Sequence, residues 1–282
     1  MKTLHSPQSV QRWAAAQRAE GRSIALVPTM GALHEGHLAL ISAAKKKADT
    51  VIVSIFVNPT QFGPNEDYAR YPRTLDDDIR RCRELGADVL FAPAADDMYA
   101  ASFSTWVNET VLSDALCGLR RPGHFKGVCT VVLKLFLICQ PQVAVFGQKD
   151  AQQALVIRRM VRDLNVPVKV ILHPTVREQD GLALSSRNRY LTESERRQAP
   201  VLYQALKQVA QLKKQGHSPA QIRRKLIRHI QTAPDARIDY VMLVDEETMA
   251  PVTKAAAGTK LLIAVAVFFG KTRLIDNVRI VW

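Results

Sequence analysis

Residues 28–37, Pro-Thr-Met-Gly-Ala-Leu-His-Glu-Gly-His, constrain the fold more than any other stretch of the sequence. The apolar run from Ile24 to Val27 precedes them and predicts a short buried strand. After them, apolar side chains recur at helical spacing from Leu38 to Ala48. A strand that leads through a glycine-containing turn into a helix can bind an anion, because free backbone N–H groups and the helix dipole both point at the ligand. The stretch therefore predicts a phosphate-binding turn.

Two histidines, His34 and His37, lie on one face of the predicted helix start, with Gly36 between them. Imidazole at this position can donate hydrogen bonds to phosphate oxygens and stabilise charge that develops in a transition state. A histidine pair at this spacing also occurs on protein surfaces and in fragments of metal sites, so the pair alone leaves these alternatives open. The His-x-Gly-His order resembles the nucleotide-binding signature of the nucleotidyltransferase superfamily that is related to class I aminoacyl-tRNA synthetases.

The first part of the chain alternates strand and helix patterns. Strand-like runs occupy residues 24–28, 51–57, 89–91, 143–146 and 168–172, and helical patterns begin near residues 6, 36, 74, 127 and 150. This alternation predicts a Rossmann-like, doubly wound parallel sheet over residues 1–176. Beyond it, two helices that begin at Thr192 and Ser218 precede three strand-like stretches, which predicts a smaller C-terminal α+β domain over residues 177–282.

Several protein classes are disfavoured by composition. The longest apolar run, Leu261 to Phe269, is too short to span a bilayer, so we expect no membrane partner. The N-terminus is polar where a signal peptide needs an apolar stretch, and we expect a cytoplasmic protein. The four cysteines have neither C-x-x-C pairing nor metal-ligand spacing, which predicts free thiols.

The formal net charge of +13 raises the hypothesis of nucleic-acid binding. Basic clusters at 158–162 and 223–228 fall on helical patterns whose apolar positions face a core, and no aromatic residues interleave them. We therefore expect no nucleic-acid partner. The positive net charge also suits an enzyme whose substrates are all anions.

Polar side chains follow two further predicted strands. Asn58 and Gln61 come after the strand at 51–57, and their amides suit a hydroxyl or carboxylate of a small substrate, although loop amides can also satisfy their own turn. Residues 146–153 form a second strand-to-helix turn, in which Lys149 can meet a phosphate and Gln153 lies one helical turn further on.

Charged groups mark two other stretches. Residues 184–188 carry Ser185, Ser186 and Arg187, which can grip an oxyanion or, alternatively, form a helix cap with a surface arginine. Residues 76–78 are three aspartates in a first helical turn. The helix dipole explains them most simply, but Asp77 can also hold Mg²⁺ through water. The sequence Gly270-Lys271-Thr272 is not a P-loop, because Val265 stands where the first glycine is required.

Together these stretches resemble the pantothenate synthetase (pantoate–β-alanine ligase) family across nearly the whole chain. The matching segments are 28–37, 55–63, 71–74, 145–150, 180–190 and 271–277, in the same order. The resemblance implies an ATP-dependent ligase of coenzyme A biosynthesis that condenses pantoate with β-alanine through a pantoyl adenylate and releases AMP and pyrophosphate. It also implies Mg²⁺ with ATP as co-substrate, a C-terminal domain that acts as a lid, and a homodimer.

The resemblance further implies roles for individual residues. The implied catalytic residues are His37, His34, Lys149, Ser185, Ser186 and Arg187, with His37 as the candidate proton donor. The implied ATP site comprises Met30, Gly31, Ala32, Leu33, His34, Glu35, Gly36, His37, Gly147, Gln148, Lys149, Asp150, Val176, Leu184, Ser185, Ser186 and Arg187. Gln61 and Gln153 are implied to bind pantoate, and Gln61 also borders β-alanine; Asn58 is a further substrate-binding candidate. Leu137, Gln142 and Ala151 depart from the family pattern, which usually has a polar residue, an aspartate and an aromatic residue there.

Two other functions compete with this interpretation. A simple adenylyltransferase of the same superfamily would stop at a nucleotidyl product and would accept no amine. A basic nucleic-acid-binding protein with a degenerate nucleotide site would bind duplexes in a salt-sensitive way without turning over ATP.

Overall fold

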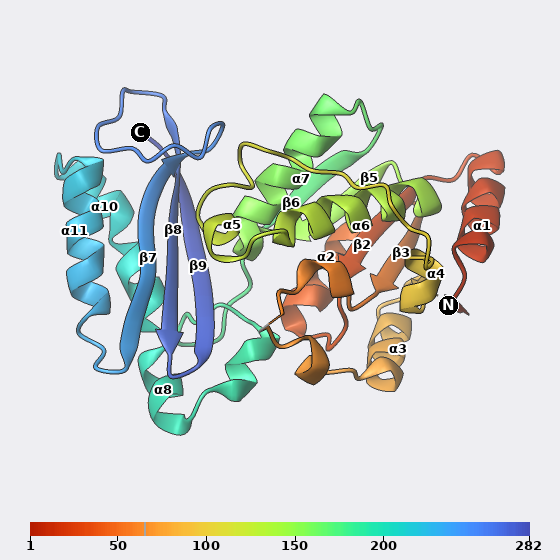
Figure 1. Ribbon diagram of the computed structural model, residues 1–282, viewed down its shortest axis with the longest axis horizontal. Coiled ribbons are helices and arrows are strands. Elements are labelled where there is room, and N and C mark those ends of the chain that lie inside the picture. The colour runs from red at the N-terminus through yellow and green to blue at the C-terminus, as the bar shows by residue number, and fades with distance from the viewer. Residues whose placement is uncertain (65) are drawn as a thin grey trace. The chain divides into compact units, whose positions relative to one another are not determined.

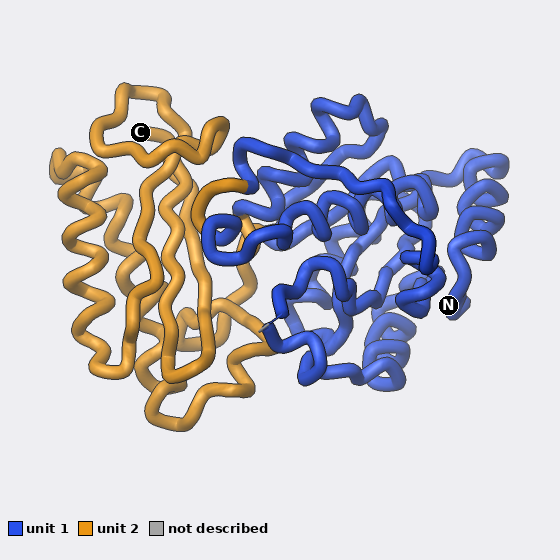
Figure 2. Tube along the Cα trace, viewed as in Figure 1, with its two compact units in different colours: residues 1–113, 117–147, 152–174 blue, residues 114–116, 148–151, 175–282 orange. Residues whose placement is uncertain are grey.

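The computed structural model describes residues 1–64 and 66–282, which form two compact units (Figures 1 and 2). The first unit comprises residues 1–113, 117–147 and 152–174, and the second comprises residues 114–116, 148–151 and 175–282. A short segment after the fifth strand therefore belongs to the second unit, although the chain on both sides of it belongs to the first.

A six-stranded parallel sheet with the order β1–β4–β3–β2–β5–β6 forms the centre of the first unit. Its strands are β1 (Lys2–Leu4), β2 (Ile24–Thr29), β3 (Thr50–Ile55), β4 (Val89–Phe91), β5 (Val143–Gly147) and β6 (Lys169–His173). In the middle of the sheet, β2 pairs with β3 on one side and with β5 on the other. The doubly wound parallel sheet that the sequence predicts is confirmed.

Helices cover this sheet and bury its apolar strands (Figure 1). The helices are α1 (Pro7–Ala19), α2 (Glu35–Lys45), α3 (Leu75–Glu84), α4 (Ala95–Met98), α5 (Cys117–Arg120), α6 (His124–Cys139) and α7 (Ala151–Asp163), with 3₁₀ turns η1 (Pro59–Gln61) and η2 (Tyr68–Arg70). Residues 24–27 and 51–53 are at most 1% exposed, as in strands packed on both faces. Alternate residues of β2 and β3 cluster with Ile41 of α2 and Cys82 of α3, whereas α1 and α6 pack against each other and against β2.

Two features of the first unit differ from the sequence expectation. The edge strand β1 was not predicted, because its three residues are too few to show a period; it pairs in parallel with β4 from Lys2↔Val89 to Leu4↔Phe91. Helix α6 begins at His124 rather than at Gly127. Gly123 precedes it with φ of 81°, a left-handed conformation that glycine adopts at little cost.

The second unit contains a three-stranded antiparallel sheet with the order β7–β8–β9 (Figure 1). Its strands are β7 (Ala236–Asp245), β8 (Lys260–Phe269) and β9 (Thr272–Val281), its helices are α8 (Glu193–Gln198), α9 (Val201–Lys207), α10 (Val209–Lys214) and α11 (Pro219–Ile230), and its 3₁₀ turns are η3 (Gln148–Asp150) and η4 (Ser186–Tyr190). Leu206 of α9 and Leu226 of α11 share a buried cluster with Val265 of β8. The smaller α+β part that the sequence predicts is confirmed.

The helix predicted from Thr192 is three short helices, α8, α9 and α10, and the expectation of one helix was wrong. Its start is as expected, because Thr192 Oγ1 accepts from the backbone N–H of Glu195 and the Glu195 carboxylate accepts from Thr192 N. Pro200 stands at the break before α9, where its ring cannot donate to the helical ladder. Residues 270–271 form the β8–β9 turn, so the sequence that resembles the end of a P-loop lies in a β-hairpin.

None of the helices in the described residues is long and apolar enough to cross a membrane. All four cysteines are free, as expected. Burial raises the pKa of the Cys82 and Cys129 thiols to about 12. These two thiols are therefore protonated at neutral pH and are poor nucleophiles.

Candidate functional site

The predicted site residues of the first unit follow three neighbouring strands of its sheet. The His-x-Gly-His loop follows β2, the Asn58–Gln61 turn follows β3, and the turn at Gly147 ends β5. The sheet order places β3, β2 and β5 side by side, and the chain reverses its winding direction between β2 and β5. Open α/β sheets bind ligands at the carboxyl ends of strands at such a switch point.

A tight turn joins β2 to α2. Thr29 Oγ1 donates to the backbone oxygen of Ser54 at 2.8 Å and accepts from Gly31 N at 3.2 Å. Gly31 has φ of 83°, and Ala32 follows it with φ of 50°, so the backbone turns through two left-handed residues. A Cβ on Gly31 would lie 3.0 Å from Ile55 Cγ2, so the turn leaves little room for a side chain there.

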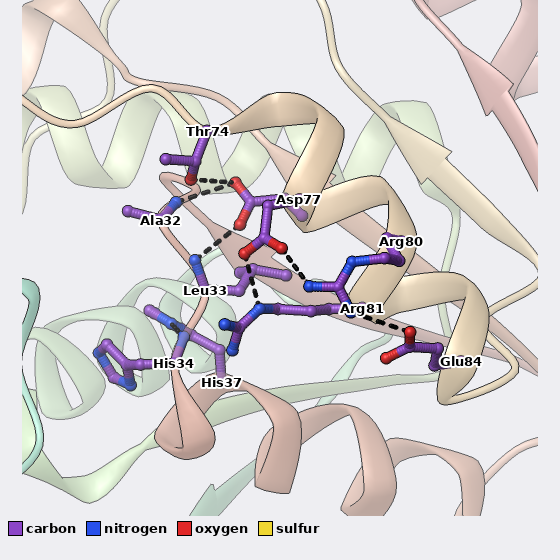
Figure 3. Close-up of polar contacts among 10 residues, drawn as sticks. Ala32, Leu33, His34, His37, Thr74, Asp77, Arg80, Arg81 and Glu84 are labelled. Carbon is purple, nitrogen blue, oxygen red and sulfur yellow. Dashed lines mark hydrogen bonds and ion pairs between the residues drawn. The ribbon is translucent and has the colours of Figure 1, made fainter.

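One buried carboxylate, Asp78, fixes this turn. Its Oδ2 accepts from Ala32 N at 2.9 Å and its Oδ1 accepts from Leu33 N at 2.8 Å, and Thr74 Oγ1 also donates to it (Figure 3). Asp78 is 1% exposed. Burial raises the pKa of its carboxyl group, and the hydrogen bonds from Leu33, Ala32 and Thr74 offset that effect only in part.

The sequence interpretation missed this role of Asp78, because it assigned residues 76–78 to the helix dipole as a group. One signal was present: Asp78 lies four residues before Cys82, an apolar residue that is buried, so the two side chains share one face of α3. The helix expected near residue 74 has Thr74 at its N-cap, but the Thr74 hydroxyl donates to Asp78 and makes no capping hydrogen bond to the backbone.

His34 and His37 are brought together at the start of α2. His34 is the N-cap, its Nδ1 accepts from Gly36 N at 3.2 Å, and His37 Nδ1 accepts from His34 N at 3.3 Å. The ring centroids are 4.1 Å apart. Because Nδ1 accepts a backbone proton in both rings, the neutral imidazoles carry their own proton on Nε2, which makes Nε2–H the donor of each ring.

Gln61 is oriented by its neighbours. Asn58 Nδ2 donates to Gln61 Oε1 at 3.2 Å, and Gln61 Nε2 lies 2.8 Å from the sulfur of Met30. Asn58 is 1% exposed, and its Nδ2 also donates to the backbone oxygen of Gly127. The two contacts of Gln61 fix which end of its amide is the donor.

A second group of contacts attaches the Gln61 backbone to the start of α6. Arg121 Nη1 lies 3.0 Å from His124 Nε2, and because arginine only donates, that nitrogen is the acceptor. His124 is therefore neutral at this contact and donates from Nδ1 to the Gln61 oxygen at 2.8 Å. Arg121 also pairs with Glu66 at 2.5 Å. A Cβ on Gly127 would lie 2.3 Å from the Thr60 oxygen, so the helix approaches the turn closely.

Gln153 lies half-buried in the first turn of α7. Its neighbour Gln152 is buried and structural, since it accepts from Cys117 N and donates to the Leu112 oxygen. The three departures from the family pattern have different surroundings. Leu137 is 61% exposed on α6, Ala151 is buried, and Gln142 Oε1 accepts from Ile24 N at 2.7 Å, so Gln142 still supplies an acceptor to the start of β2.

The second unit contains the remaining candidates. Lys149 lies in η3, with its Nζ 3.7 Å from Asp150 Oδ1. Ser185 is the N-cap of η4 and accepts from Arg187 N at 3.3 Å, so one hydroxyl of the predicted oxyanion grip caps a 3₁₀ turn. The Val176 oxygen accepts from Leu184 N at 3.0 Å and closes the loop that precedes this turn.

Asp77, the candidate magnesium ligand, faces a different set of partners. Its Oδ2 accepts from Arg81 Nε at 2.8 Å, and its Oδ1 is paired with Arg80 (Figure 3). Among residues 1–64 and 66–282, no group of three or more histidine, cysteine, aspartate or glutamate side chains could hold a metal ion.

Comparisons with known proteins agree with the fold and show the family. A family model described as pantoate-beta-alanine ligase matches residues 2–279. The chain is 55% identical over 279 residues to the pantothenate synthetase of Moorella thermoacetica, and the match covers 99% of this chain and 98% of that protein.

Solved structures are similar over the same range. The crystal structure of pantothenate synthetase from Thermus thermophilus has a TM-score of 0.91 and 48% identity, and the match covers 99% of each chain. The pantoate-beta-alanine ligase from Francisella tularensis, complexed with beta-gamma ATP and beta-alanine, has a TM-score of 0.80 and 35% identity over 99% of this chain and 97% of that chain. With a family match and high identity over nearly its full length, the chain belongs to the pantoate–β-alanine ligase family, an enzyme family of the ligase class that its sequence predicts.

Proposed function

We propose that this protein condenses pantoate with β-alanine in two steps at the expense of ATP. In the first step a carboxylate oxygen of pantoate attacks the α-phosphorus of Mg·ATP, the bond to the bridging oxygen breaks, and pyrophosphate leaves. In the second step the amine of β-alanine attacks the acyl carbon of the pantoyl adenylate, the carbon–oxygen bond to AMP breaks, and the amine loses a proton. The products are pantothenate, AMP and pyrophosphate.

The observation that carries this proposal is the fixed orientation of His34 and His37. Both rings accept a backbone proton at Nδ1, which leaves Nε2–H as the donor, and both stand at the N-terminus of α2. Attack at phosphorus gathers negative charge on the equatorial and leaving oxygens, and donors that are already oriented stabilise that charge without reorganisation. Met30 to His37 then form one part of the ATP site, with His37 as the proton donor.

The neighbouring turn supplies the pantoate contacts of the proposal. Gln61 has an amide held by Asn58 on its oxygen side, and its Nε2, which contacts the Met30 sulfur, carries a second proton that we propose to be donated to a hydroxyl or carboxylate of the substrate. Gln153 is the second pantoate ligand of the proposal, and Gln61 also borders β-alanine. A contact that is made equally in the ground state and in the transition state lowers KM and has little effect on kcat.

Separate roles are proposed for the second unit. Gln148 to Asp150, Val176 and Leu184 to Arg187 contribute to nucleotide binding, with Lys149, Ser185, Ser186 and Arg187 at the phosphates, and Gly147 of the first unit is a further proposed nucleotide-binding residue. Mg²⁺ enters as part of the Mg·ATP substrate, and it neutralises phosphate charge there. Most ligands of such an ion are phosphate oxygens and waters. A water-mediated contact from Asp77 stays a prediction. The proposal further includes the division of the chain near residue 176, a lid role for its C-terminal part and a homodimer.

The test is pyrophosphate release from ATP, Mg²⁺ and pantoate, with and without β-alanine, together with mass analysis of the products. We expect turnover that depends on β-alanine and yields pantothenate and AMP. Pyrophosphate release without an amide product would instead establish an adenylyltransferase. No turnover of ATP, with salt-sensitive duplex binding, would replace the proposal by the nucleic-acid-binding alternative.

Variants of His37 test the role of its ring. His37→Ala should lower kcat by roughly 10²–10³, the scale for one transition-state donor. His37→Asn keeps an acceptor near the Nδ1 position and lacks the Nε2 donor, so it separates the helix cap from the catalytic contact. We expect kcat to fall in both variants and to stay at the wild-type value in the control His217→Ala. A wild-type kcat in His37→Asn would remove His37 from the chemistry.

A further inference from the structure

The segment 271–277 matches the family signature, yet none of its residues enters the proposed reaction. Within it, Asp276 and Asn277 are each 3% exposed although both are polar. They are consecutive residues of β9, so their side chains point to opposite faces of the antiparallel sheet. Buried polar side chains in a strand need partners, and the partners of these two lie in the segment of Lys149 and in the loop that precedes Ser185.

Asn277 holds the segment of Lys149. Its Nδ2 donates to the backbone oxygens of Gln148 and Lys149, each at 2.9 Å, across about half the length of the chain. The amide orientation is fixed by chemistry, because the flipped amide would place Oδ1 against two carbonyl oxygens. Both protons of the amide are therefore used on the backbone of η3, and the direction in which Lys149 leaves the backbone is tied to β9.

Asp276 holds the loop that leads to Ser185 and Arg187. Its carboxylate forms a two-pronged pair with Arg177, with Nη1 to Oδ2 at 2.6 Å and Nη2 to Oδ1 at 2.9 Å. Arg177 also donates to the Gly181 oxygen at 3.1 Å. The guanidinium carbon of Arg177 lies 3.8 Å from the centre of the Tyr203 ring, which fixes its plane.

This loop is further closed next to the serines. Arg177 forms a β-bridge with Ala183, and Leu184 N donates to the Val176 oxygen. Ser185 follows directly and caps η4. The conformation of the 176–184 loop, and with it the starting point of η4, is thus tied to Asp276 through a single arginine.

We propose that Asp276 and Asn277 are positioning residues that set the two anion-binding segments of the second unit, 148–150 and 185–187, from adjacent positions of one strand. The inference rests on the proposed function, in which Lys149, Ser185, Ser186 and Arg187 bind the phosphates of ATP. Neither Asp276 nor Asn277 touches substrate in this assignment. They act through the backbone of Lys149 and through Arg177.

The main test is Asn277→Asp, which keeps the shape and replaces the donating amide by a group that faces two carbonyl oxygens. We expect the KM for ATP to rise about tenfold or more, because a displaced ligand costs up to about 10² in rate or affinity, while the KM for pantoate stays unchanged. Arg279→Gln is the matched control. Arg279 lies on the same strand and face and pairs with Glu246, without contact to residues 148–149. If Asn277→Asp and Arg279→Gln raised the KM for ATP equally, Asn277 would have only a structural role and the inference would be overturned.

A second variant keeps the test decisive if Asn277→Asp folds poorly, and hydrogen exchange adds an independent measurement if it folds. Asp276→Asn should raise the KM for ATP as well, because Arg177 loses one of its two carboxylate oxygens. Hydrogen exchange should become faster at the amides of residues 148–151 in Asn277→Asp at temperatures where β9 stays protected. Unchanged exchange in that segment, or an unchanged KM for ATP in both variants, would refute the positioning role.

A double-mutant cycle separates this inference from the proposed function. If Asn277 acts through Lys149, adding Asn277→Asp to Lys149→Ala should change the KM for ATP by less than about twofold, whereas independent effects would multiply. If Lys149→Ala alone leaves ATP kinetics unchanged, the phosphate role of Lys149 fails. If Lys149→Ala impairs ATP use and Asn277→Asp does not, only the positioning inference fails.

Discussion

Replacing Asp78 by Asn perturbs the histidine loop without touching a histidine. The side chain keeps its shape and one acceptor oxygen, but the other oxygen becomes an NH₂ group that faces a backbone N–H. Either Ala32 N or Leu33 N, which bond to the carboxylate at 2.9 and 2.8 Å, then loses its partner. The site is 1% exposed, so water does not replace the lost acceptor.

The expected change in the free energy of unfolding follows from two opposing effects. A buried N–H without a partner costs about 1–3 kcal/mol. Burial already raises the pKa of Asp78, so removing its charge recovers part of that cost. We expect Asp78→Asn to lower the free energy of unfolding by about 1–2 kcal/mol, the lower part of that range. Because Leu33 leads directly into His34, we also expect kcat to fall by about tenfold to 10²-fold.

Denaturant unfolding and steady-state kinetics measure the two effects. Asp77→Asn is the control for the unfolding measurement, since its pairs with Arg80 and Arg81 lie on the helix surface, where water screens them. A raised carboxyl pKa in the folded state means that folding takes up a proton. The contribution of Asp78 to stability is therefore fully present below about pH 4 and is lost as pH rises through the raised value. Asp78→Asn should remove this part of the pH dependence. Wild-type kcat together with unfolding indistinguishable from Asp77→Asn would refute the reasoning.

Three further outcomes are expected around the same unit. Gln61→Ala should raise the KM for pantoate and leave the unfolding midpoint unchanged, and a normal pantoate response would remove Gln61 from the site. Gly127→Ala should destabilise the protein by about 1–3 kcal/mol in denaturant unfolding, because the new Cβ meets the Thr60 oxygen at 2.3 Å and the clash exceeds the helix propensity gained. Burial raises the pKa of Glu66, but the hydrogen bond and charge of Arg121 outweigh it and hold that pKa below its usual range. Its stabilising effect is thus present above about pH 4.3 and lost as pH falls further, so the midpoints of wild type and Glu66→Gln should converge in acid.

The sequence predicted the parts of this fold that repeat locally. The apolar runs of β2 and β3 identified strands buried on both faces, and the capping residues Ser6 and Thr192 identified helix starts, because these signals lie within a few residues of one another. The expectation of a single helix after Thr192 was wrong because the helix breaks at Pro200. This break is also a local signal, and the sequence shows it. Strand β1 could not be predicted, because a three-residue strand is specified by its partner β4.

The residues of the candidate site also fall into two groups, those that the local sequence indicates and those that depend on contacts distant in the sequence. The groups that are proposed to face a ligand are polar residues after strands, and their spacing indicates them: His34, His37 and Gln61. The groups that hold them are not distinguishable by type. Asp78 stands in a run of three aspartates, and it differs from Asp77 in its contact with a loop more than forty residues earlier. Asn277 lies more than a hundred residues from the backbone it holds.

This division has a physical basis. A donor that must meet phosphate is placed at a strand end by topology, which the order of strands and helices already implies. The orientation of this donor, however, is set by buried hydrogen bonds between segments that folding brings together. Each such bond matters because a buried polar group without a partner costs about 1–3 kcal/mol. A buried polar residue on an otherwise apolar face, four residues from a core position as Asp78 is from Cys82, is therefore the sequence signal to examine for positioning residues in chains of this kind. The test of that rule is direct: charge-neutral isosteres at such positions should lower kcat or affinity, whereas the same substitution at an exposed position of the helix that has no proposed contact with substrate or metal should not.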